Sequence, residues 1–66
     1  MNKFALGDVL DVSQEFAIYS EAIVEDSFVK KNGSVYYKIR GIKSDGTMGK
    51  KTHDLWEDTD GIKKVK

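Results

Sequence analysis

Asn32-Gly33 is the sequence feature that most limits what this chain can fold into. It separates residues 22–30 from residues 35–42, and both stretches are rich in the β-branched and aromatic residues typical of strands. Asn-Gly tolerates positive φ at both central positions of a type I′ turn, whose twist matches that of two paired strands. The sequence therefore predicts a β-hairpin closed by a two-residue loop.

The loop length sets the pairing in this hairpin, and strand alternation sets the direction of each side chain. A two-residue loop pairs Val29 with Tyr36 and Phe28 with Tyr37. The set that we expect to face the core is Val35, Tyr37, Ile39 and Gly41. The opposite set is Tyr36, Lys38, Arg40 and Ile42. It places a tyrosine and two cations in a row on the outer face of the sheet.

Two further turn signals extend the hairpin into a larger β-structure. Asp45-Gly46 lies at the centre of a short turn and returns the chain through a third strand at residues 48–53. Residues 54–57 suit a single 3₁₀ turn, because the segment is too short for a stable α-helix. A last turn at residues 58–61 precedes a short strand at residues 62–65.

The first third of the chain fits more than one structure. Residues 4–12 read as a short strand interrupted at Gly7-Asp8. Residues 14–23 fit both an amphipathic helix and an alternating strand. We expect a strand or an irregular loop up to Tyr19. Five short strands would leave exposed edges in an open sheet, so we expect an all-β fold whose sheet closes into a small barrel.

Length and composition indicate a small domain without covalent cross-links. The 66 residues suffice for one domain, residues 1–66, with a thin core. The chain has no cysteine, and its first residues contain no apolar stretch typical of a signal sequence, so we expect a cytoplasmic protein. No segment approaches the roughly 18 apolar residues that cross a membrane. Residues 1–33 carry three lysines against six acids, whereas residues 34–66 carry eight basic groups against five acids.

The order of these features resembles that of the small SH3-like barrels. FALGDVLDV is similar to their opening strand, AIVEDSFVKKNGSVYYKIRGI to their central strands, and HDLWEDTDGIKKV to the polar turn and 3₁₀ segment before their last strand. The resemblance implies a five-stranded SH3-like barrel. Such barrels bind peptides, nucleic acids, methylated lysines or other subunits, and small orphan proteins of phage and mobile elements often adopt them. The paired tryptophans of the proline-binding members are absent, which argues against recognition of proline-rich peptides.

The residues of the outer row suggest binding. Tyr36 beside Lys38 and Arg40 suits docking on an acidic protein surface, and equally suits stacking on a base with contacts to phosphate. A solvent-facing strand without function is the plain alternative. We expect Trp56, the only tryptophan, to plug one end of the barrel, although its indole would also serve as a partner contact. A basic rim available to nucleic acid would consist of Lys50, Lys51, Lys63 and Lys64, if the strands that carry them are neighbours.

The ionisable residues show no pattern typical of a catalytic centre or a metal site. His53 and Asp54 are adjacent, but neighbours on a strand point to opposite faces. The acids at positions 54, 57, 58 and 60 lack the remainder of a calcium-loop pattern. The sequence therefore predicts a non-catalytic module, without metal or cofactor, that binds another protein through Tyr36, Lys38, Arg40 and Trp56. Nucleic-acid binding through the same strand and the four rim lysines is the alternative.

Overall fold

The computed structural model describes residues 3–65, and this part of the chain forms one antiparallel sheet without a helix. The strands are β1 (Val9–Asp11), β2 (Glu21–Val29), β3 (Val35–Ile42), β4 (Met48–Trp56) and β5 (Lys63–Lys64). Their order across the sheet is β4-β3-β2-β1-β5, so β1 pairs with both β2 and the last strand. The prediction of an all-β fold with five strands is confirmed.

The two hairpins that join β2, β3 and β4 are closed by the same three-residue loop. In the first, the Gly33 amide donates to the Lys30 carbonyl (2.9 Å) and the Lys30 amide donates to the Ser34 carbonyl (2.8 Å). The second hairpin repeats both bonds around Gly46, and φ is +89° at Gly33 and +87° at Gly46. This is a type I turn followed by a left-handed glycine. The predicted type I′ loop is wrong, because Asn32 does not take positive φ.

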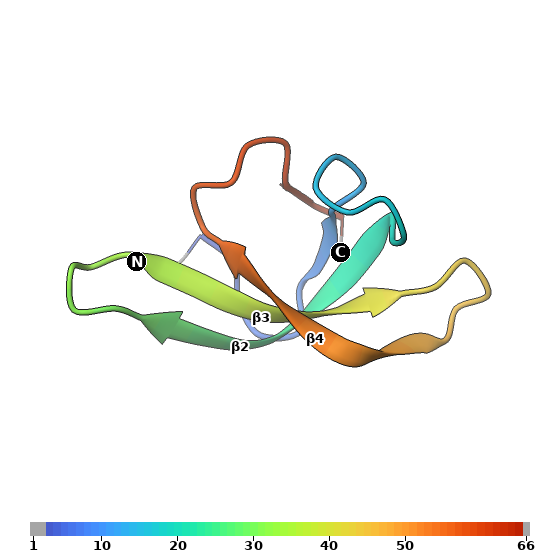
Figure 1. Ribbon diagram of the computed structural model, residues 1–66, viewed down its shortest axis with the longest axis horizontal. Helices are drawn as coiled ribbons and strands as arrows, with labels where there is room; N and C mark the ends of the chain where they lie inside the picture. Colours follow the sequence, from blue (N-terminus) through green and yellow to red (C-terminus); the bar gives the residue numbers. More distant parts are fainter. Residues whose placement is uncertain (1–2, 66) are drawn as a thin grey trace.

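The longer loop moves the strand pairing by one position. Phe28 lies opposite Tyr36 and Val29 opposite Val35, in place of the predicted partners. Since successive side chains point to opposite faces of a strand, this shift turns Phe28 onto the outer face beside Tyr36. Figure 1 shows the two hairpins extending in opposite directions from the middle of the molecule.

The core lies on one face of the bent sheet. Register shifts interrupt the β2–β3 ladder between Val24 and Asp26 and the β3–β4 ladder between Arg40 and Ile42, and such bulges bend and twist strands. The buried apolar residues are Phe4, Leu10, Val12, Ala22, Val24, Tyr37, Ile39, Leu55 and Ile62. The loop between β1 and β2 and the segment between β4 and β5 lie over this face (Figure 1). The expected inward set of β3 is confirmed, with Val35 only partly buried.

Other sequence-based expectations are corrected by the structure. The sheet is not closed into a barrel, because β4 and β5 form its two edges and do not pair with each other. The predicted 3₁₀ turn at residues 54–57 is wrong, since Asp54, Leu55 and Trp56 continue β4 and pair with β3. Residues 13–20 form an irregular loop, as expected up to Tyr19. Within residues 3–65, no helix is long and apolar enough to cross a membrane.

Candidate functional site

Three aromatic side chains lie side by side on the face of the sheet turned away from the core. Pairing places Phe28 of β2 opposite Tyr36 of β3, and Tyr36 opposite Trp56 of β4. The ring centroids of Phe28 and Tyr36 are 5.1 Å apart with an interplanar angle of 22°, and those of Tyr36 and Trp56 are 5.4 Å apart at 52°. We call Phe28, Tyr36 and Trp56 the aromatic row.

The place of Trp56 corrects the expectation that it plugs one end of a barrel. Because β4 runs on to Trp56, strand alternation turns Leu55 inward and Trp56 outward. Leu55 is buried, whereas 41% of Trp56 is exposed. Single exposed apolar side chains are common, but a contiguous row of exposed rings that ends in an indole is a feature of binding surfaces.

The aromatic row already holds a cation from its own chain. The Lys30 ammonium lies 5.1 Å from the centroid of the Trp56 ring and 5.9 Å from that of Tyr36. A cation within about 6 Å of a ring face is attracted by the ring quadrupole, most strongly by tryptophan. The face of the Trp56 ring therefore suits a positive group.

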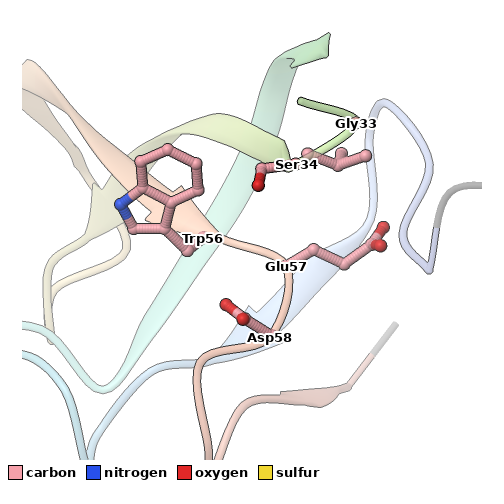
Figure 2. A pocket seen from close by; sticks show the side chains of 6 residues that line it. Gly33, Ser34, Trp56, Glu57 and Asp58 are labelled. Atoms are coloured by element: carbon pink, nitrogen blue, oxygen red, sulfur yellow. The ribbon is translucent and has the colours of Figure 1, made fainter. Parts of the chain in front are cut away.

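A hollow of about 180 Å³ lies beside Trp56. Its lining consists of Gly33, Ser34, Val35, Trp56, Glu57 and Asp58, and we call it the acidic hollow. Figure 2 shows the Ser34 hydroxyl and the Asp58 carboxylate on the side of the indole, and the Glu57 side chain directed away from it. The lining carries two acidic side chains and no basic one, so it attracts positive charge.

Glu57 anchors one wall of the acidic hollow to the rest of the fold. Its carboxylate accepts hydrogen bonds from the Lys3 backbone amide (2.8 Å) and from the hydroxyl of buried Tyr37 (2.5 Å). The Lys3 amide, followed by the Tyr37 hydroxyl, lowers the pKa of Glu57 from its ordinary value. Burial and the bond to Glu57 raise the pKa of Tyr37. Glu57 is thus held ionised, while the Asp58 carboxylate stays exposed.

The two cations of the predicted outer row face outward, but each has a partner within the chain. Lys38 lies 3.5 Å from Asp54 of β4. Arg40 donates to Glu25 (2.9 Å) and to the carbonyls of Gly49 (2.9 Å) and Lys50 (3.0 Å), where β4 is irregular. The bond from Arg40 lowers the pKa of Glu25. Arg40 therefore contributes to the shape of the sheet, and neither cation is fully available to phosphate.

The structure separates the lysines that were expected to form one basic rim. Lys50 and Lys51 belong to β4, whereas Lys63 and Lys64 form β5 at the opposite edge of the sheet. Lys64 also pairs with Asp8 at 3.6 Å. The rim therefore divides into two unrelated pairs.

His53 and Asp54 point to opposite faces, as strand alternation predicted. The His53 ring packs near the rings of Phe16 and Tyr19, and the Asp54 carboxylate pairs with Lys38 on the outer face. Across the described residues 3–65, no group of three or more His, Cys, Asp or Glu side chains is placed to hold a metal ion.

Sequence reasoning did not identify Phe28, Lys30, Ser34 or Asp58 as parts of the site. Phe28 lies beside Tyr36 only because the three-residue loop sets the register of β2 against β3. Ser34 and Asp58 line the same hollow only in the folded protein. The sequence was compatible with this loop. A three-residue loop, in which a type I turn is followed by a glycine with positive φ, is the next most common way to close a hairpin after the two-residue primed turns.

Comparison of the chain with models of known protein families, with curated proteins and with solved structures finds no match.

Proposed function

We propose that this protein is a non-catalytic module that binds another protein through the aromatic row and the acidic hollow. The observation that carries the proposal is the alignment of Phe28, Tyr36 and Trp56 across three strands, facing away from the core. Aromatic residues are enriched in protein interfaces and supply much of their binding energy. An order of strands in which the first pairs with the last supports a relation to the SH3-like barrels, here in an open form.

The electrostatics of the surface favour a partner with a basic side chain. Lys30 already places an ammonium over Trp56, and Glu57 and Asp58 line the hollow beside the indole. An arginine or lysine of a partner would meet an aromatic face on one side and a carboxylate on the other. The same carboxylates would repel phosphates, so this face favours a protein over nucleic acid.

Binding without catalysis is supported by the thin core. Among the described residues no charged side chain is buried, and the buried Tyr37 hydroxyl is bonded to Glu57. General acids and bases depend on partly desolvated positions that shift their pKa values toward neutrality, and the aromatic row provides no such enclosure.

Selection from a random peptide library tests the proposal. Wild-type protein should enrich peptides that combine an arginine or lysine with apolar residues, and Trp56→Ala should weaken their binding by about 30-fold or more, as for an interface hot spot. Met48→Ala is the matched control, because Met48 lies on the same strand with the same exposed fraction, 41%, as Trp56.

A second pair of variants tests the charge of the hollow. Asp58→Asn should weaken the selected peptides, whereas Asp60→Asn, also exposed but outside the hollow, should not. Peptides that bind Trp56→Ala and Asp58→Asn as tightly as wild type would place the binding surface elsewhere.

A further inference from the structure

A second surface, at the far end of β4 from Trp56, differs from the aromatic row in both shape and charge. It is a trough of about 360 Å³, within the size range of sites that hold organic ligands. Its lining consists of Ile18, Tyr19, Lys43, Lys50, Lys51 and His53, and we call it the lysine trough. We infer that the lysine trough binds single-stranded nucleic acid, with a base on the Tyr19 ring and phosphates on the lysines.

The floor of the lysine trough is an aromatic ring laid across two glycines. A β-carbon at Gly41 would lie 2.4–2.5 Å from three carbons of the Tyr19 ring, and one at Gly49 would lie 2.7 Å from its hydroxyl oxygen. One face of the ring therefore rests directly on the backbone of β3 and β4. Tyr19 nevertheless remains partly exposed and lines the trough, with the His53 ring 5.9 Å away. Rings held in this way offer a stacking surface to any base.

The apolar part of the trough is open to water. Ile18 is 84% exposed, although it lies beside Tyr19 in the irregular loop that leads to β2. An apolar side chain of this size next to an aromatic floor is more favourably placed against a flat base than in solvent.

The lysines of the lysine trough are less closely paired than Lys38, Arg40 and Lys64, although the pKa of Asp45 is lowered first by the bonds from Thr47 and then by Lys43. Lys43, Lys50 and Lys51 form no ion pair within residues 3–65, whereas Lys38, Arg40 and Lys64 each do. No carboxylate belongs to the lining of the trough. Three lysines around an apolar floor complement a ligand that alternates flat bases with phosphates, which is single-stranded nucleic acid.

Binding of a labelled oligothymidylate of about 12 nucleotides, followed by fluorescence anisotropy, tests the inference. The logarithm of the association constant should fall with the logarithm of salt concentration with a slope of about −2, because each neutralised phosphate of a single strand contributes about −0.7. Absence of binding at low salt would overturn the inference.

Charge-matched variants locate the site. Lys50→Gln with Lys51→Gln should reduce the slope to about −0.7, whereas Lys63→Gln with Lys64→Gln, at the other edge of the sheet, should leave the slope and the affinity unchanged. Equal losses in the two double variants would reject the trough in favour of diffuse attraction.

The ring is tested separately from the charges. Tyr19→Leu should weaken binding about fivefold or more without changing the salt slope, and Tyr19→Phe should retain the affinity. Circular dichroism of each variant checks that the sheet is intact. Displacement of the oligonucleotide by polyglutamate as readily as by unlabelled oligothymidylate would instead assign the trough to an acidic protein segment. None of these outcomes depends on the aromatic row.

Discussion

Replacement of Gly41 by alanine should destabilise the protein through a single clash with Tyr19. The new β-carbon would lie 2.4–2.5 Å from three ring carbons, whereas carbon atoms in favourable contact are about 3.5–4.0 Å apart. The ring must therefore move by about 1 Å or more, and overpacking of this kind costs about 1–3 kcal/mol. The core of a domain of this size rarely supplies more than about 3–5 kcal/mol of net stability, so the loss is a large fraction of the total.

Removal of the ring should reverse the sign of this effect. Gly41 does not have positive φ, so its backbone conformation accepts alanine. In a Tyr19→Ala background, Gly41→Ala should stabilise the protein by about 0.5–1 kcal/mol, because glycine within a strand is less favourable than alanine. The double-mutant cycle should then give a coupling energy of about 1.5–4 kcal/mol.

Gly49 provides a matched comparison for the same cycle. A β-carbon there would meet the Tyr19 hydroxyl oxygen at 2.7 Å and the ring carbon that bears it at 3.3 Å. Tyr19→Phe should therefore relieve much of the cost of Gly49→Ala and little of the cost of Gly41→Ala.

Urea unfolding followed by the fluorescence of Trp56, the only tryptophan, measures all of these variants. The reasoning would be refuted by additive costs, in which Gly41→Ala destabilises the Tyr19→Ala protein as much as wild type. A change in the slope of the unfolding free energy against urea concentration would show that a variant had altered the compactness of the folded or the unfolded state, and not this contact alone.

Two further predictions concern the first hairpin and the acid side of the pH–stability curve. Gly33→Ala should cost about 1–2 kcal/mol in urea unfolding, because φ at this position is +89°, and Gly33→Asn should cost less; equal costs would contradict this account of the loop. Since the pKa of Glu57 is lowered in the folded state, its contribution to stability is complete above the unfolded value of 4.5 and is lost as the pH falls through the lower folded value. Tyr37→Phe should therefore flatten the dependence of stability on pH below 4.5, and unchanged steepness would show that the hydroxyl does not hold this carboxylate.

The strands flanking Asn32-Gly33 were predictable, because β-branched and aromatic residues on both sides of a turn favour one local arrangement. Their register was not, because it depended on whether Asn32 or only Gly33 takes positive φ. That single backbone choice decides whether Phe28 lies opposite Tyr36 or Tyr37. The outward direction of Tyr36, Lys38 and Arg40 followed from alternation and needed no knowledge of the register.

Trp56 and Tyr19 show why the remaining parts of the two surfaces were not predictable. Trp56 extends β4 only because Tyr36 of β3 supplies a pairing partner, a tertiary effect that overrides the local preference for a turn. The Tyr19 floor forms between a loop and two strands. Gly41 and Gly49 did carry a signal for it, since glycine within a strand often marks a site of close approach.

The pairing of β1 with β5 has a consequence for the way the chain reaches its native state. The two hairpins of β2, β3 and β4 join neighbouring segments and can form in microseconds. Leu10 and Asp11 of β1, in contrast, pair with Lys64 and Lys63, which lie far along the sequence. During synthesis, β1 therefore keeps one edge without a neighbour until Lys63 and Lys64 have left the ribosome. A chain that ends early should present this edge to other molecules, and such unpaired strands are where aggregation begins.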